Sequence, residues 1–142
     1  MSVSPAVRTL LASFAYRSRV ETVLDRAKRE FGLQATEIVV LLLLGTESAN
    51  ITEISRAVAL RRNGVSILVE RLRCRGLVER HRDGSDRRVA NVTLSEAGRD
   101  VSARLDRYLD EPLEALLGTL SDGERTQLLS LIDRLATSPN AT

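Results

Sequence analysis

Apolar residues recur with helical spacing through the first third of the chain. Ser4-Pro5 is typical of a helix start, with serine as the cap and proline in the first turn. The helical spacing continues to about Glu30, and Gly32 is a suitable end. A second helix is predicted over Ala35–Leu44, with Gly45 as its stop. Because this second helix is apolar on nearly every side, we expect it at the centre of the core.

Two short helices separated by a tight turn are predicted next. The first covers Asn50–Ala59, and its first residue forms a capping-box arrangement with Glu53. The second covers Asn63–Arg75, follows a turn at Leu60–Arg62, and is expected to use its first residue, Asn63, as the cap. Its buried face is predicted to consist of Val65, Leu68, Val69 and Leu72.

The spacing then changes from helical to alternating. Leu77–Arg82 and Arg88–Leu94 are predicted to be two strands, and the four residues Asp83-Gly84-Ser85-Asp86 have the composition of a tight turn. Ser95 is expected to cap a further helix, which Pro112 should kink or end.

The order of the elements predicts the fold class. A last helix follows a capping box made by Ser121 and Glu124. Two short helices directly before a hairpin are the order of a winged helix-turn-helix. We therefore expect a mainly α protein with a small β-hairpin wing. In this prediction residues 1–142 form a single domain, residues 33–95 its winged helix-turn-helix DNA-binding part, and residues 1–32 and 96–142 its flanking dimerisation helices.

Charge is distributed unevenly along the chain. The net charge is only +2, but residues 56–88 hold ten arginines against four acidic residues, whereas residues 89–142 are acidic. A local basic excess of this size is typical of a surface that meets a phosphate backbone, although a solvated charged face gives the same pattern. Nearly all basic residues are arginine, whose planar guanidinium suits phosphate and guanine contacts.

Composition narrows the class of protein further. Cys74 is the only cysteine, so no internal disulfide framework is expected. No apolar stretch is long enough to span a membrane, and the first ten residues do not resemble a signal peptide. We therefore expect a cytoplasmic protein that makes no membrane contact.

The second short helix carries the predicted base-reading residues. Its outward positions near the start combine arginine, asparagine and serine, which can pair with base edges in the major groove. Ile67 has two interpretations, a core residue at the edge of the buried face or a contact with thymine methyl groups. Arg71, with Arg73 and Arg75, is expected to contact phosphate or to lie in solvent. The candidate DNA-binding residues of this helix are Arg62, Asn63, Ser66, Ile67 and Arg71.

The hairpin carries the second part of the candidate interface. Arg82, Arg87 and Arg88 surround a tight turn, and an arginine-tipped wing can enter the narrow, electronegative minor groove. Asp86 would repel phosphate unless another side chain uses it, so we interpret it as a brace that orients an arginine of the wing.

These residues resemble the multiple-antibiotic-resistance repressor (MarR) family over residues 33–98. The resemblance rests on Gly76-Leu77-Val78-Glu79-Arg80, Asp86-Arg87-Arg88 and Val92-Thr93-Leu94-Ser95-Glu96-Ala97-Gly98. It implies a homodimer that binds double-stranded DNA at a pseudo-palindromic operator, commonly as a repressor, and in many members a small-molecule, oxidant or metal signal. It also implies that Asp86 is the wing aspartate and Arg88 the minor-groove arginine. Gly64, Ile67 and Gln34 depart from the family pattern.

Residues that could sense a signal are few. Cys74 is expected to be a partly buried thiol without special reactivity, with redox sensing as the alternative. His81 is the only histidine, so no metal site is expected, and no cofactor is predicted. Four aromatic residues could line an effector cavity or be ordinary core: Phe14, Tyr16, Phe31 and Tyr108.

Two other classes of protein are alternatives to a regulator. An enzyme is not expected, because the sequence offers no nucleophile paired with a base and no glycine-rich phosphate loop. A winged-helix module that contacts proteins and does not bind DNA is the alternative, although an arginine-rich wing argues against it.

Overall fold

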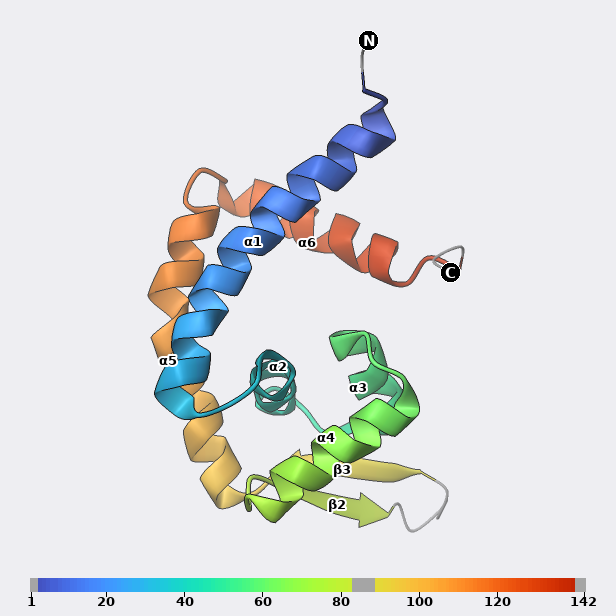
Figure 1. Ribbon diagram of the computed structural model, residues 1–142, viewed down its shortest axis with the longest axis vertical. Helices are drawn as coiled ribbons and strands as arrows, with labels where there is room; N and C mark the ends of the chain where they lie inside the picture. The colour runs from blue at the N-terminus through green and yellow to red at the C-terminus, as the bar shows by residue number, and fades with distance from the viewer. Residues whose placement is uncertain (1–2, 83–88, 140–142) are drawn as a thin grey trace. The chain divides into compact units, whose positions relative to one another are not determined.

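The computed structural model describes residues 3–82 and 89–139 (Figure 1). In chain order the elements are α1 (Pro5–Phe31), α2 (Ala35–Leu44), β1 (Ala49–Asn50), α3 (Ile51–Val58), α4 (Arg62–Cys74), β2 (Val78–Arg82), β3 (Ala90–Leu94), α5 (Glu96–Leu117) and α6 (Asp122–Ala136). They form two compact units, one of Leu24–Leu109 and one that combines Met1–Val23 with Asp110–Thr142. The assignment of residues 1–32 and 96–142 to a dimer interface stays a prediction.

The core of the Leu24–Leu109 unit is built around α2. Ile38, Val40 and Leu41 of α2 are fully buried, and the helix contacts α3, α4 and β3. This confirms the central position that its apolar sequence predicts. The predicted buried face of α4 is also confirmed, because Val65, Leu68, Val69 and Leu72 are at most 3% exposed.

The hairpin belongs to a three-stranded antiparallel sheet with the order β1-β3-β2. Val78 of β2 pairs with Leu94 of β3, and Arg82 pairs with Ala90. The sequence did not predict β1, which is only two residues long and pairs Ala49 with Val92. This short strand joins the start of α3 to the hairpin, so the helix-turn-helix and the wing share one framework.

The helix caps confirm most of the predicted boundaries. Asn50 accepts a 2.9 Å hydrogen bond from the backbone N–H of Glu53 at the start of α3. The predicted Asn63 cap is wrong, because α4 begins at Arg62 and the extended residue before it is Arg61. The cap of α4 makes no side-chain hydrogen bond. The turn between the two helices is instead closed through Ala59, which adopts a left-handed conformation with φ of 54°.

Two glycines allow α5 to approach the rest of its unit closely. Ser95 caps α5 as predicted, since its Oγ accepts a 3.0 Å hydrogen bond from Gly98 N. A Cβ atom on Gly98 would overlap the carbonyl group of Leu77. A Cβ on Gly45 would meet Ser102 Oγ, which donates a 2.9 Å hydrogen bond to Leu41 O. These contacts fix the first half of α5 to α2 and to the base of the hairpin.

The unit of Met1–Val23 and Asp110–Thr142 contains the start of α1, the end of α5 and α6. The predicted capping box of α6 is present, with Ser121 and Glu124 bonded reciprocally. Pro112 does not end α5, which continues to Leu117. None of the described helices has the length and apolar character needed to cross a membrane.

Candidate nucleic-acid interface

The outward face of α4 presents polar and charged side chains at its first turn. The opposite face of α4 packs into the core. On the outward face, Arg62 and Asn63 are exposed and Ser66 is half-buried. Ile67 is 61% exposed, so its interpretation as a core residue is wrong. An exposed isoleucine among polar residues remains available for the methyl group of a thymine. The base-reading roles of these residues stay predictions.

A groove of about 290 Å³ brings this turn together with the sheet and the start of α3. Arg62, Asn63 and Ser66 line it from α4, Thr52 lines it from α3, and Arg80 lines it from β2. Sequence reasoning missed Arg80 as a candidate. Arg80 lies two residues after the buried Val78 in β2. Side chains two residues apart in a strand lie on the same face, so Arg80 shares the face of the sheet that meets the helices. The two-residue spacing from an apolar position of the strand was the feature of the sequence that could have identified Arg80.

In the second half of α4, Glu70 orients the side chain of Arg73. Arg73 contacts Glu70 through two hydrogen bonds of 2.9 and 2.6 Å. The hydrogen bond and charge of Arg73, followed by smaller effects from Cys74 and Arg80, lower the pKa of Glu70 to about 2. The same pair raises the pKa of Arg73. Glu70 therefore stays ionised and holds the guanidinium of Arg73 against α4.

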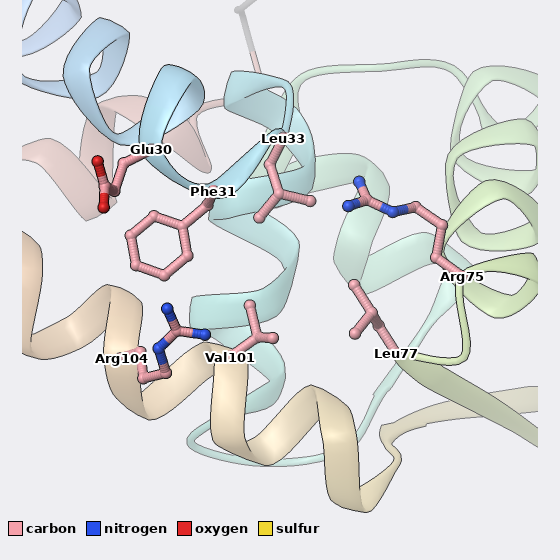
Figure 2. A pocket seen from close by; sticks show the side chains of 7 residues that line it. All are labelled: Glu30, Phe31, Leu33, Arg75, Leu77, Val101 and Arg104. Atoms are coloured by element: carbon pink, nitrogen blue, oxygen red, sulfur yellow. The ribbon is translucent and has the colours of Figure 1, made fainter.

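Arg75 is 43% exposed and also contacts the junction between α1 and α2 (Figure 2). Its Nη1 donates a 3.0 Å hydrogen bond to Gly32 O and lies 4.0 Å from Glu37 Oε2. Glu37 is 3% exposed, and its other oxygen accepts a 2.8 Å hydrogen bond from the backbone N–H of Gln34. Within the described residues, Oε2 of Glu37 has no hydrogen-bond partner. Arg75 thus supplies the nearest positive charge to a buried carboxylate, and its predicted place in solvent or against phosphate stays a prediction. Arg71 is exposed, as expected.

The structure describes the two strands of the wing, β2 and β3. Arg82 is the exposed last residue of β2, while Asp86, Arg87 and Arg88 lie outside the described residues. His81 is exposed on β2, with Nε2 3.1 Å from Thr93 Oγ1 and 3.4 Å from Glu79 Oε2. Within residues 3–82 and 89–139, no group of three histidine, cysteine or acidic side chains could hold a metal ion.

The predicted sensing residues differ from expectation in their burial. Cys74 is exposed, and its Sγ lies 3.6 Å from Glu70 Oε1, so the thiol is not partly buried. The four aromatic residues are not ordinary core. Phe14, Tyr16 and Tyr108 are 61%, 43% and 37% exposed, and Phe31 is half-buried at the edge of a cavity.

The chain is similar in sequence to a known family of proteins. A model of the MarR family matches residues 31–89. The uncharacterized HTH-type transcriptional regulator YwhA of Bacillus subtilis (strain 168) is 28% identical over 89 residues, which is 63% of this chain and 64% of that protein. The match therefore spans less than two thirds of the length of this relative.

Two solved structures share the fold over nearly the whole chain. The structure of NadR in complex with 4-hydroxyphenylacetate has a TM-score of 0.78 and 19% identity, covering 96% of this chain and 95% of NadR. That of BpsR from Bordetella bronchiseptica, whose DNA binding is regulated by 6-hydroxynicotinic acid, has a TM-score of 0.69 and 26% identity. It covers 92% of this chain and 98% of BpsR.

These findings confirm the predicted family and fold class. The matched segment contains α2, α3, α4 and β2, the elements that hold the candidate interface. The family is one of transcription regulators, in agreement with the prediction that the chain is not an enzyme. Residues 31–89, which include the helix-turn-helix and the first strand of the wing, therefore match the MarR family.

Proposed function

We propose that the protein is a sequence-specific regulator of transcription that binds double-stranded DNA with α4 in the major groove and the hairpin as a wing. The observation that carries this proposal is the groove that joins Arg62, Asn63 and Ser66 of α4 to Arg80 of β2. A recognition helix reads bases with residues near its N-terminus, and neighbouring arginines neutralise phosphate charge. The wing would place Arg82, Arg87 and Arg88 against the backbone and the minor groove, with Asp86 as their brace.

The proposal includes a homodimer. Apolar side chains at both ends of the chain are exposed in the single chain: Val7, Leu10, Leu11 and Phe14 of α1, and Leu129, Leu131, Ile132 and Leu135 of α6. Burying them against a second copy in an isologous interface would remove this apolar surface from water. A two-fold dimer would set its recognition helices about 34–36 Å apart and would require a pseudo-palindromic operator.

Light scattering coupled to size exclusion tests the dimer. A monomer at micromolar concentration would contradict it. So would a variant lacking residues 1–30 that stayed dimeric and bound DNA like the full chain.

The proposal extends to regulation by a small molecule or by stress, most simply as a repressor that leaves its operator when the signal arrives. Its support is the similarity to BpsR, whose DNA binding is regulated by 6-hydroxynicotinic acid, and to NadR with its bound 4-hydroxyphenylacetate. Such a regulator would act in the cytoplasm, where it meets the genome.

A gel-shift assay on the promoter beside the gene, with a scrambled duplex of equal length, tests DNA binding. We expect the promoter fragment to bind more tightly than the scrambled one. Arg88→Ala should weaken binding and its salt dependence, because one counterion-displacing charge is lost. Asp86→Ala should also weaken binding, although it removes a negative charge, because the brace is lost. Equal weak binding to both duplexes would favour the protein-interaction module instead.

A further inference from the structure

We propose that Asn63, in the first turn of α4, is a site of spontaneous deamidation that disables the recognition helix as the protein ages. Asn63 is exposed and is followed directly by Gly64. Because glycine has no Cβ atom, its backbone nitrogen can approach the side chain of the preceding residue with little steric hindrance. The loss of DNA reading rests on the proposed function, whereas the covalent chemistry does not.

The reaction is an intramolecular substitution at the side-chain amide. The backbone nitrogen of Gly64 gives its proton to a base from solvent and attacks Cγ of Asn63. The bond from Cγ to the side-chain nitrogen breaks, that nitrogen takes up a proton and leaves as ammonia, and a cyclic imide remains. Water then opens the ring at either carbonyl, which leaves aspartate or isoaspartate at position 63. The net change is the uptake of one water and the release of one ammonia, so no oxidant or reductant is needed.

The attacking nitrogen is not held by the helix. The hydrogen bond from Val65 N to Arg61 O, at 3.0 Å, closes the first turn of α4. The N–H of Gly64 therefore precedes the hydrogen-bond ladder of the helix, where only an N-cap side chain could accept from it locally. The N-cap residue is Arg61, whose side chain makes no capping hydrogen bond.

The first turn of α4 also opens easily. The reaction requires such opening, because the helical conformation keeps the Gly64 nitrogen away from Cγ of Asn63. Gly64 has a low helix propensity, and the turn contains no acidic residue to complement the helix dipole. Arg61 and Arg62 instead place positive charge at the positive end of that dipole. These features all weaken the turn that holds the amide.

The charge around Asn63 favours both the reaction and its consequence. Arg62 and Arg80 line the same groove, and none of the described residues that line it is acidic. A nearby positive charge favours an anion, so these arginines stabilise the deprotonated nitrogen that attacks. They would then pair with the carboxylate of the product, which withdraws them from phosphate. Deamidation thus removes an amide that can pair with adenine and adds a negative charge to the surface that meets DNA.

The test follows the full chain, without DNA, during incubation at mildly alkaline pH. Trypsin releases residues 63–71, in which Asn63 is the only amide side chain, and residues 89–99, in which Asn91 is the only one. Asn91 is the internal control, because the buried, β-branched Val92 follows it in β3. We expect mass spectrometry to show exchange of NH₂ for OH about tenfold or more faster at Asn63 than at Asn91, with aspartate and isoaspartate both formed. A zero-time sample digested in the same way corrects for exchange during digestion.

Gly64→Ala is the variant that keeps the asparagine and hinders the attack. A Cβ at this position lies 3.6 Å from Leu60 Cβ, which is an ordinary contact, so the variant should fold, with circular dichroism as the check. We expect its deamidation at Asn63 to be several-fold slower than in the wild-type chain. A wild-type chain that keeps Asn63 intact for as long as Asn91 would overturn the inference. So would an unchanged rate at Asn63 in the Gly64→Ala protein.

Fluorescence anisotropy with the promoter duplex measures the consequence. We expect aged wild-type protein to bind the duplex about tenfold or more weakly than fresh protein, and aged Gly64→Ala protein to bind like its own fresh sample. Unchanged affinity of a chain fully deamidated at Asn63 would overturn the inferred loss of DNA reading. A chain that binds the promoter and keeps Asn63 intact would overturn this inference alone. A chain that deamidates at Asn63 but never binds the promoter would support the chemistry and contradict the proposed function.

Discussion

The guanidinium of Arg75, at the end of α4, donates a 3.0 Å hydrogen bond to the carbonyl oxygen of Gly32, at the end of α1. The same group lies 4.0 Å from Oε2 of the buried Glu37, an oxygen that has no hydrogen-bond partner among the described residues. Arg75, the C-cap residue of α4, thereby contacts the junction between α1 and α2. This tie fixes one end of the helix that is proposed to read DNA.

Removing Arg75 should therefore destabilise the fold. Arg75→Ala leaves a buried carboxylate without its nearest cation, and we expect the free energy of unfolding to fall by about 1–3 kcal/mol. Urea unfolding measures this, with Arg71→Ala as the matched control, because Arg71 is exposed on the same helix. Combining Arg75→Ala with Glu37→Gln should recover part of the loss, since no buried charge then remains. Equal stability of the Arg75→Ala and Arg71→Ala proteins would contradict the tie.

A second prediction concerns the approach of α5 to the hairpin at Gly98. Alanine at this position would place its Cβ against the backbone carbonyl of Leu77, and backbone cannot move aside cheaply. Gly98→Ala should cost about 1–3 kcal/mol or more of stability. Gly123→Ala in α6 is the control, because a Cβ there meets nothing within 4 Å. That control should be neutral or slightly stabilising, since alanine favours helix over glycine. Similar thermal midpoints for the two variants would show the close approach to be unimportant.

The pair of Glu70 and Arg73 predicts a pH dependence. The pKa of Glu70 is lowered from 4.5 to about 2 in the folded protein, mainly by the Arg73 hydrogen bonds. A lowered pKa means that the folded state favours the charged form. The stability that the pair contributes is thus complete above pH 4.5 and is lost as the pH falls towards 2.

Comparing the wild-type chain with Glu70→Gln by urea unfolding across this range checks the dependence. The difference in stability between the two proteins should be constant near neutral pH and should shrink in acid. A difference that stays the same down to the lowest pH at which the chain folds would refute the assignment.

Arg80 gives a prediction about the interface that the sequence pattern alone did not provide. Its position in the groove beside Arg62 and Asn63 makes it a phosphate-neutralising residue in the proposed complex. Arg80→Ala should weaken binding to all duplexes by a similar factor and should reduce the slope of log affinity against log salt by about 1. Fluorescence anisotropy at several salt concentrations measures both quantities. Arg107→Ala, which removes an exposed charge from α5, should change neither.

The elements that sequence reasoning placed correctly are those with strong local signals. The apolar run of α2, the Asn50 cap of α3 and the Ser121 capping box of α6 are all properties of neighbouring residues. The error at the start of α4 has a local cause too: Asn63 is a good cap, yet the helix begins one residue earlier with no side-chain cap. Nothing in a two-residue segment could have predicted β1, because its pairing with β3 is a tertiary interaction.

Some residues of the candidate site could also be predicted from local spacing, whereas others depend on tertiary contacts. Exposed residues at the start of α4 follow from helical spacing, so Arg62, Asn63 and Ser66 could be proposed from the sequence. The contact of Arg75 with Gly32 joins residues 43 positions apart, and no local pattern indicates it. Likewise Ile67 could not be assigned to core or surface by spacing, because it lies at the edge of the buried face. Its exposure depends on which other elements pack against α4, and none of them covers it.

If α4 reads the DNA sequence, single-residue variants at its start must change the base preferences of the protein. Selection of binding sites from a randomised duplex library gives the preference at each position for the wild-type chain, Asn63→Ala and Ser66→Ala. We expect each variant to lose preference at particular positions, repeated symmetrically in the two half-sites, with about 1–3 kcal/mol of discrimination lost for each good contact. Base preferences identical to wild type in both variants would contradict this role of α4.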